Sequence, residues 1–158
     1  MGIAILSKDS VLYKKGYGYS DLKEKKRFTT NTIMNIASIS KTFIGTSIMY
    51  LVENKQINLD DDINKLLPFH IYNPHSPESI ITLRALMSHT SGIIDNQEIY
   101  LSSYHYGKDS PIKLGYFLKN YLSKNGEFFS EDNFNNKTIG KEFAYSNIGA
   151  GLAAYIVE

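Results

Sequence analysis

The strongest structural signal in the sequence is a helical pattern of apolar residues from about Ser38 to Asn54. The apolar positions recur at spacings of three and four residues: Ile39, Phe43, Ile44, Ile48, Leu51 and Val52. This spacing places them on one broad side of an α-helix. Because most helical stability in proteins comes from packing of such a side, we expect the helix to be buried against the rest of the fold.

Two capped helices are predicted downstream of it. Asp60 is expected to cap a short helix that Pro68 ends, and the acidic run LDDD at 59–62 suits a helix start better than a metal site. Thr82 is expected to cap the next helix. That helix stops at the sequence SHTSG, where Gly92 is the expected left-handed cap.

The second half of the chain predicts two more helices. One is amphipathic and covers residues 111–122, and the last runs from Ile148 toward Val157. The polar, Tyr-rich stretch 95–110 between the helices has no clear period. The chain is therefore expected to be mainly helical after its first 36 residues.

The N-terminal residues predict a β-hairpin. Residues 3–6 and 11–19 are β-prone runs separated by Lys8-Asp9-Ser10, whose short polar side chains suit a tight turn. A two-stranded hairpin is marginal in water, and its open edges invite pairing. The hairpin must therefore pack on helices or on strands that this chain lacks, and we expect self-association through the exposed sheet edge. The last helix also lacks a stop signal, so we expect an incomplete domain.

Composition excludes several classes of partner and chemistry. The 158 residues hold 17 Lys and Arg against 16 Asp and Glu, a net charge of +1, so no general attraction for nucleic acid is expected. Without cysteine there is no disulfide framework, thiolate nucleophile or Cys-ligated zinc. No apolar run is long enough to cross a membrane, and no signal-peptide pattern is visible at the N-terminus.

The four histidines do not indicate a metal site. His70, His75, His89 and His105 are scattered and form no His-Glu-x-x-His pair, so we expect neither a metal nor a cofactor. For His89, capping or backbone hydrogen bonding at a helix end is the simpler explanation. A Gly-x-Ser-x-Gly elbow is also absent.

Three Ser-x-x-Lys pairs occur, and their contexts differ. They are Ser20/Lys23, Ser38/Lys41 and Ser110/Lys113, and chance alone predicts about one or two. Residues i and i+3 share a helix face, so the lysine amine can receive the serine proton. Ser38 alone precedes a long apolar helix, whose N-terminus favours a developing oxyanion. Plain N-capping is the alternative role for Ser38.

Tyr145-Ser146-Asn147 is the second candidate motif. It is the one Tyr-x-Asn in the sequence, where chance predicts about one, and it stands just before the last helix. Neither this motif nor Ser-x-x-Lys indicates catalysis by itself. Their joint context is more specific.

At this level the sequence resembles the class C β-lactamase-related serine hydrolases of the serine β-lactamase and penicillin-binding protein superfamily. The similar segments, in the family's order, are 16–22 (GYGYSDL), 36–43 (IASISKTF), 51–61 (LVENKQINLDD), 81–93 (ITLRALMSHTSGI) and 143–149 (FAYSNIG). The resemblance implies a partial α+β fold, with a helical subdomain and the first two strands of an antiparallel sheet. It implies one incomplete domain, 1–158, with a hairpin and lead-in at 1–36 and both motifs in the mainly helical part, 37–158.

The resemblance also implies a role for each motif residue. Ser38 would attack an acyl carbonyl and carry the acyl-enzyme, and its backbone amide would donate to the oxyanion. Lys41 and Tyr145 would share proton transfer, with the identity of the acylation base left open. Asn147 would bind the substrate amide or orient Lys41. Residues 89–92 would be structural.

The implied function is hydrolysis of an amide, β-lactam or ester bond in a small-molecule or peptide substrate. Substrate choice is expected to depend on the loop Tyr100 to Tyr106 and on a strand that this sequence lacks. No Lys-Thr-Gly or His-x-Gly segment follows the last predicted helix to supply a second oxyanion donor, a loss of roughly 10²–10³ in rate. We therefore expect weak activity or none, the alternative being a non-catalytic remnant or binding module. Relatives are often exported, and the compartment is left open.

Overall fold

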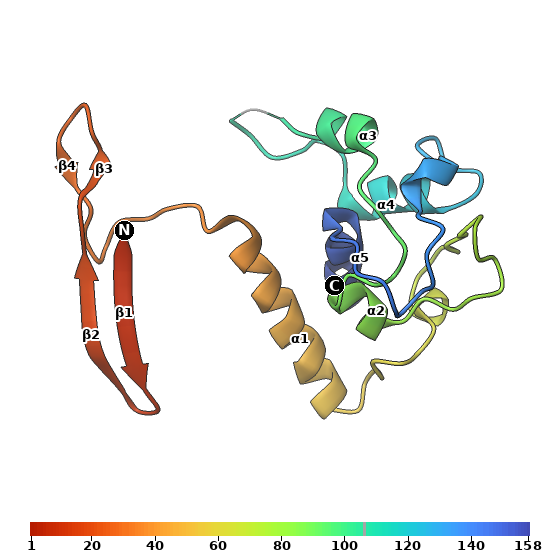
Figure 1. Cartoon of the computed structure of the whole chain (residues 1–158), viewed down its shortest axis with the longest axis horizontal. Coiled ribbons are helices and arrows are strands. Elements are labelled where there is room, and N and C mark those ends of the chain that lie inside the picture. The colour runs from red at the N-terminus through yellow and green to blue at the C-terminus, as the bar shows by residue number, and fades with distance from the viewer. Residues whose placement is uncertain (106) are drawn as a thin grey trace. The chain divides into compact units, whose positions relative to one another are not determined.

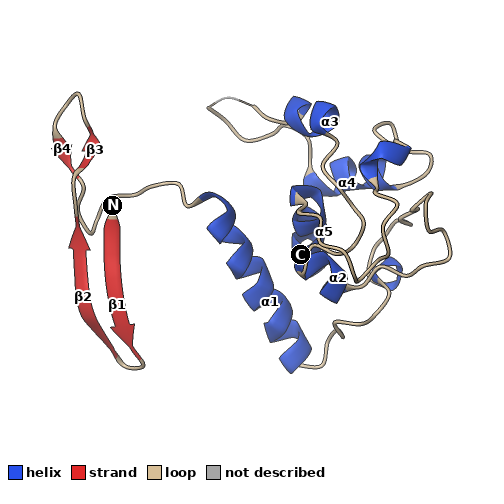
Figure 2. Ribbon diagram, viewed as in Figure 1, coloured by secondary structure: helices blue, strands red, loops and turns tan. Residues whose placement is uncertain are grey.

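The computed structural model describes residues 1–105 and 107–158. It is a mixed α/β structure with five α-helices and two small antiparallel sheets in this part of the chain (Figures 1 and 2). The chain divides into two compact units, Met1–Ala37 and Ser38–Glu158. All the α-helices belong to the second unit, in agreement with the predicted fold class.

The first unit contains the predicted hairpin. Strand β1 (Gly2–Ser7) pairs antiparallel with β2 (Ser10–Gly16), and Ser7 lies opposite Ser10 at the turn. The second arm is shorter than predicted, because β2 ends at Gly16 and Gly18 turns the chain with a φ of 74°. A Cβ at Gly16 would lie 2.3 Å from the carbonyl oxygen of Phe28, so only glycine allows this close approach.

A second small sheet in this unit was not predicted. Strand β3 (Tyr19–Asp21) pairs antiparallel with β4 (Lys26–Arg27). Oδ1 of Asp21 accepts hydrogen bonds from the backbone N–H groups of Lys23 and Glu24 and so closes the turn between the strands. The charged stretch that follows Gly18 is therefore a tight hairpin.

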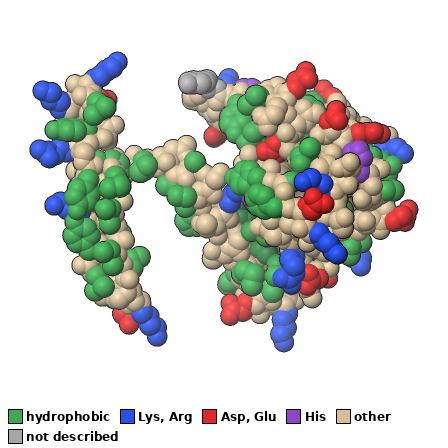
Figure 3. Space-filling model, viewed as in Figure 1, with side chains coloured by type: hydrophobic (Ala, Val, Ile, Leu, Met, Phe, Trp, Pro, Cys, Tyr) green, Lys and Arg blue, Asp and Glu red, His purple; other side chains and the backbone are tan. Residues whose placement is uncertain are grey.

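Apolar side chains are exposed along the first hairpin. Figure 3 shows hydrophobic atoms along this unit, and its exposed large hydrophobic residues include Ile3, Ile5, Leu6, Val11 and Leu12. Both strands of a two-stranded sheet are edge strands, with one row of backbone polar groups unpaired on each. The expected self-association through this edge stays a prediction.

The second unit begins with the predicted long helix. A 3₁₀ turn at Ala37–Ser40 leads into α1 (Lys41–Glu53), so Ser38 lies in the turn and not in the α-helix proper. Of the apolar stripe, Ile48 is buried, whereas Ile39 and Phe43 are exposed. The expectation of a buried helix was wrong for its first turns, since the core contacts come from the middle and the end of α1.

Helix α2 (Leu83–Met87) is capped as predicted at its start but not at its end. Oγ1 of Thr82 accepts a hydrogen bond from the backbone N–H of Ala85. At the C-terminus, His89 adopts the left-handed conformation with a φ of 56°, and Thr90 donates to the carbonyl of Ala85. These are features of a Schellman motif whose left-handed residue is His89. Gly92, the predicted cap, also has a positive φ but lies beyond the motif.

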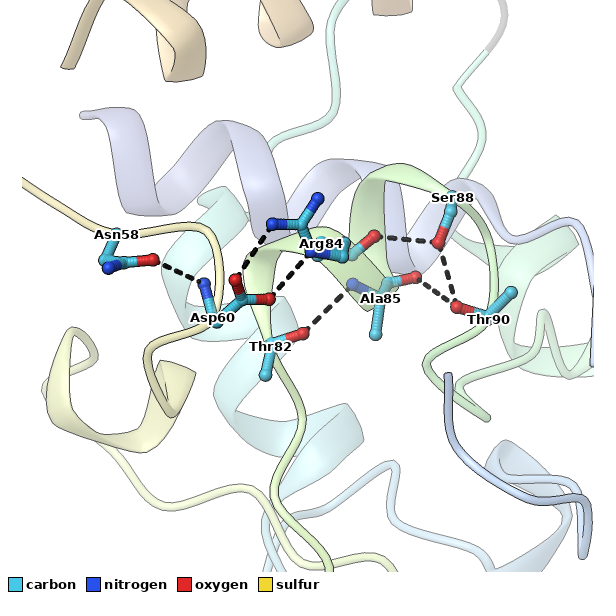
Figure 4. A network of polar contacts seen from close by, with 7 residues as sticks. All are labelled: Asn58, Asp60, Thr82, Arg84, Ala85, Ser88 and Thr90. Carbon is cyan, nitrogen blue, oxygen red and sulfur yellow. Dashed lines mark hydrogen bonds and ion pairs between the residues drawn. The ribbon is translucent and has the colours of Figure 1, made fainter. Parts of the chain in front are cut away.

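The prediction for Asp60 was wrong as well. Asp62 caps the short 3₁₀ turn Ile63–Lys65, by accepting from the backbone N–H of Asn64. Asp60 instead holds Arg84 through two hydrogen bonds of 2.7 and 2.8 Å (Figure 4). The guanidinium of Arg84 lowers the pKa of Asp60. The turn starts two residues later than expected because Asp62 has the extended conformation that an N-cap requires.

The remaining helices surround the core of this unit. They are α3 (Gln97–Ser102), which was not predicted, α4 (Leu114–Leu122) and α5 (Asn147–Val157). Helix α5 contacts α1, α2 and α4. The fully buried core residues include Ile63, Leu83, Leu86, Ile93, Leu118, Tyr121, Leu122 and Leu152. None of the helices described has both the length and the apolar character needed to span a membrane.

Candidate active site

Ser38 and Lys41 lie at the start of α1 and contact each other. Nζ of Lys41 donates a hydrogen bond of 3.1 Å to Oγ of Ser38. The 3₁₀ turn brings positions i and i+3 onto one face, because it has about three residues per turn. Ser38 is exposed and Lys41 is half-buried, so the hydroxyl faces solvent and the amine lies behind it.

Tyr145 and Asn147 reach the same place from the start of α5. The hydroxyl of Tyr145 lies 2.8 Å from Oγ of Ser38, and Oδ1 of Asn147 accepts a hydrogen bond of 2.8 Å from Nζ of Lys41. The four residues predicted from the two motifs are therefore brought together within hydrogen-bond distance. Two segments more than a hundred residues apart in sequence contribute to the cluster.

The cluster favours loss of the Tyr145 proton. Polar contact with the Lys41 ammonium and then hydrogen bonding with Ser38 lower the pKa of Tyr145 from its usual 10.0. The ammonium lies 5.2 Å from the centre of the phenol ring. A hydroxyl that contacts both an amine and a phenol of lowered pKa has two neighbours able to exchange its proton.

Asp95 is a charged neighbour of this cluster that sequence reasoning missed. Its carboxylate accepts four hydrogen bonds from the Ser146–Ile148 segment at the start of α5. One is from the Nδ2 group of Asn147, at 2.8 Å. Asp95 lies in the non-periodic stretch after Ile94 and forms no local motif, so only the fold reveals its partners.

His89 packs against the phenol of Tyr145. The two ring centres are 4.4 Å apart, and Nδ1 of His89 accepts a hydrogen bond from the backbone N–H of Ser146. Burial and then the nearby Lys41 charge lower the pKa of His89. An accepting Nδ1 carries no proton, so the neutral ring is the form that fits. This agrees with the backbone-bonding role considered for His89 from its sequence position.

Two cavities adjoin the cluster. One of about 250 Å³ is lined by Lys41, His89 and apolar residues of α1, α2 and α5. The other, of about 340 Å³, is bordered by Asn147 and Tyr100 and by apolar side chains of α4. Of the loop expected to influence substrate choice, Tyr100 lines this second cavity, whereas Tyr106 lies outside the described residues. No cluster of His, Asp or Glu suited to a metal ion occurs among the residues that the structure describes.

Comparison with known proteins gives a consistent family match. A family model described as Beta-lactamase matches residues 1–158. The chain is 31% identical to Protein flp of Staphylococcus aureus (strain MRSA252) over 99% of its own length and 29% of that protein. It is 28% identical to Penicillin-binding protein 4* of Bacillus subtilis (strain 168), covering 94% of this chain and 30% of that protein.

Solved structures show the same similarity in three dimensions. The octameric penicillin-binding protein homologue from Pyrococcus abyssi matches with a TM-score of 0.71 and 27% identity, over 99% of this chain and 34% of that chain. FmtA from Staphylococcus aureus matches with a TM-score of 0.64 and 25% identity, over 99% of this chain and 38% of that chain. The chain thus spans less than a third of the curated relatives' length.

Proposed function

The chain belongs to the β-lactamase family, a family of the serine-hydrolase type, and from that premise we propose that Ser38 is an acyl-accepting nucleophile. The observation that carries the proposal is the double contact on Oγ of Ser38, from Nζ of Lys41 and from the hydroxyl of Tyr145. Plain N-capping needs neither contact. We also propose that residues 1–158 are parts of one β-lactamase-type domain, because the family model extends over both units.

In the proposed first step, Oγ of Ser38 bonds to the carbonyl carbon of the substrate and its proton passes to a basic neighbour. The base is either the Tyr145 phenolate or the neutral Lys41 amine. The proton then moves to the leaving nitrogen or oxygen as its bond to the carbonyl carbon breaks. The product of this step is an ester of Ser38, and water releases the acid in a second step.

Asn147 is proposed to orient Lys41. The sequence left two roles open for this side chain, and the hydrogen bond from Nζ of Lys41 to Oδ1 favours orientation of the lysine. The same bond fixes the amine close to both Ser38 and Tyr145. Alignment of reacting groups is a large part of catalysis, since a shift of about 1 Å can cost about 10²-fold in rate.

The proposed substrates are β-lactams, peptides with D-amino acids and simple esters. These share a carbonyl that an exposed hydroxyl can reach, and the apolar cavity beside Asn147 offers space for an acyl substituent. Slow turnover is expected of the 158-residue chain, so a test should detect the acyl-enzyme itself.

The test is covalent labelling of Ser38. The chain should react with a fluorescent penicillin or a fluorophosphonate, and mass spectrometry should find the label on the peptide that contains Ser38. Ser38→Ala should abolish labelling. Ser110→Ala is the matched control, because Ser110 belongs to another Ser-x-x-Lys pair, and it should label normally. An unlabelled chain, or a label that persists in Ser38→Ala, would favour the alternative of a non-catalytic binding module.

A further inference from the structure

We propose that Asp95 is the positioning residue of this centre, which fixes the side-chain amide of Asn147 so that its oxygen faces Lys41. The inference rests on the proposed function for its catalytic meaning, but the geometry it describes can be measured without activity. Asp95 is half-buried and lies outside both sequence motifs.

The two oxygens of the Asp95 carboxylate accept hydrogen bonds from different residues. Oδ1 accepts from Oγ of Ser146 at 2.9 Å and from the backbone N–H of Ile148 at 3.0 Å. Oδ2 accepts from the backbone N–H of Asn147 at 3.0 Å and from its side-chain Nδ2 at 2.8 Å. The second pair holds the backbone and the side chain of Asn147 with one oxygen atom.

This arrangement determines which way the amide of Asn147 points. An amide has a donating and an accepting end, and its orientation follows from its partners. Nδ2 faces the Asp95 carboxylate, which can only accept, and Oδ1 faces the Lys41 ammonium, which can only donate. The flipped amide would set oxygen against carboxylate and NH₂ against ammonium. Without Asp95, the side-chain amide of Asn147 would lose one of the two charged partners that fix its orientation.

The segment that carries Asp95 is itself held on both sides. The buried hydroxyl of Tyr121 accepts from the backbone N–H of Asn96 at 2.7 Å and donates to the carbonyl of Ile94 at 2.8 Å. The backbone N–H of Ile94 donates to the carbonyl of Asn133 at 3.0 Å. Asp95 thus stands on backbone that is fixed to α4 and to the turn at Glu131–Asn133.

The competing explanation is that Asp95 only caps α5. It does accept from two backbone N–H groups at the start of that helix, and a carboxylate there is favourable. Ser146 shares the capping task, since its Oγ accepts from the backbone N–H of Gly149. Ser146→Ala removes this cap and one hydrogen bond to Oδ1 of Asp95, but it leaves both hydrogen bonds between Asn147 and Oδ2 of Asp95. It is therefore the control for loss of capping.

The kinetic test compares Asp95→Asn with Ser146→Ala in the single-turnover rate of Ser38 labelling. Asp95→Asn should lower the rate by about 10²-fold, the scale of a misplaced group. Ser146→Ala should lower the melting temperature with little change in rate. In an Asn147→Ala background, Asp95→Asn should have little further effect, because the amide it fixes is absent. Rates that fall in parallel with melting temperature in both variants, or full additivity with Asn147→Ala, would overturn the inference.

A spectroscopic test on the unmodified chain does not depend on activity or on a variant that folds. NMR should detect a scalar coupling across the hydrogen bond between Nδ2 of Asn147 and the Asp95 carboxylate carbon. Its absence, with Asn147 side-chain signals like those of a free amide, would overturn the inference even if Ser38 is labelled. Its presence in a chain that fails to label would uphold the positioning geometry and reject only the proposed function.

Discussion

Nζ of Lys41 donates a 2.8 Å hydrogen bond to Oδ1 of Asn147, a residue 106 positions further along the chain. The bond joins the first residue of α1 to the first residue of α5. It leaves the ammonium close enough to Ser38 for a second hydrogen bond of 3.1 Å. The Lys41 side chain therefore links Ser38 of its own motif to Asn147 of the second motif, and its removal should change the environment of both motifs.

Lys41→Met should raise the pKa of Tyr145 toward 10.0, because polar contact with Lys41 is the first cause of the present lowering. The measurement is a pH titration of the Tyr145 ring, followed by NMR of its Cζ carbon. Lys113→Met, at the lysine of another Ser-x-x-Lys pair, is the control and should leave this titration unchanged. A Tyr145 pKa that does not move in Lys41→Met would contradict the assigned cause.

Tyr145→Phe and Lys41→Met together distinguish the two candidate bases. If the Tyr145 phenolate takes the Ser38 proton, labelling should rise with pH through the lowered Tyr145 pKa, and Tyr145→Phe should abolish that rise. If the neutral Lys41 amine is the base, labelling should persist in Tyr145→Phe and be lost in Lys41→Met. A labelling rate that is independent of pH in the unmodified chain would exclude the Tyr145 phenolate as the base.

Acid should destabilise the chain partly through His89. Burial and then the Lys41 charge lower its pKa below 6.5, so the folded state binds the proton less readily than the unfolded chain. The stability due to the neutral ring is complete above about pH 6.5 and is lost as pH falls through the lowered pKa. His89→Asn keeps a residue type that tolerates positive φ and should reduce the loss of stability with falling pH. Equal pH dependence in both proteins, by urea unfolding, would contradict this.

Tyr121→Phe should cost about 1–3 kcal/mol of stability, because the backbone N–H of Asn96 and the carbonyl of Ile94 lose a buried partner. Labelling of Ser38 should slow as well, since these two groups flank Asp95. Tyr116→Phe is the matched control on the same helix. Its hydroxyl donates to Glu127 at 3.2 Å on the exposed surface, so its loss should matter much less. Equal unfolding free energies for the two variants would contradict a stabilising role for the two hydrogen bonds of the Tyr121 hydroxyl.

Thr82→Ala should destabilise the chain by about 1 kcal/mol, the usual cost of losing an N-cap. Ser88→Ala at the other end of α2 removes a hydroxyl that bonds the Arg84 carbonyl on the surface, and its effect should stay within about 0.5 kcal/mol. Chemical unfolding measures both changes. The assignment of Thr82 as the cap is wrong if Ser88→Ala proves the more costly substitution.

Self-association through the first hairpin should appear as a rise in molar mass with protein concentration. Light scattering over a dilution series measures it, and Ile5→Lys should suppress it by placing a charge on an edge strand. Lys8→Gln, in the turn outside both strands, is the control and should associate like the unmodified chain. A monomer at every concentration would contradict the prediction.

Local patterns predicted the parts of the structure that depend on neighbouring residues. The Ser38–Lys41 contact follows from a spacing of three residues in a helical turn, and the Thr82 cap follows from a side chain that bonds its own helix. Helix N-caps were predicted less well where several possible capping residues follow one another in the sequence. Asp62, and not Asp60, caps the turn Ile63–Lys65, because Asp62 has the extended backbone conformation of an N-cap. The acidic run alone does not show which of its residues has that conformation.

Contacts between distant segments could not be read from spacing. Asp95 bonds residues about fifty positions later, and nothing in its own neighbourhood distinguishes it from a solvent-exposed acid. His89 was expected to be structural, but that His89 and not Gly92 is the left-handed residue depends on the Schellman bonds that close α2. The convergence of Tyr145 on Ser38 was inferred from family resemblance, since spacing alone leaves the two motifs unrelated.

The four hydrogen bonds on Asp95 also bear on how a charged substrate could be recognised. The positive end of α5 would ordinarily attract an external anion, but Asp95 and Ser146 already occupy the first three N–H groups of that helix. An incoming carboxylate would meet an internal anion there and be repelled. If a proposed substrate carries a carboxylate, its counter-ion is therefore not expected at the backbone N–H groups that begin α5.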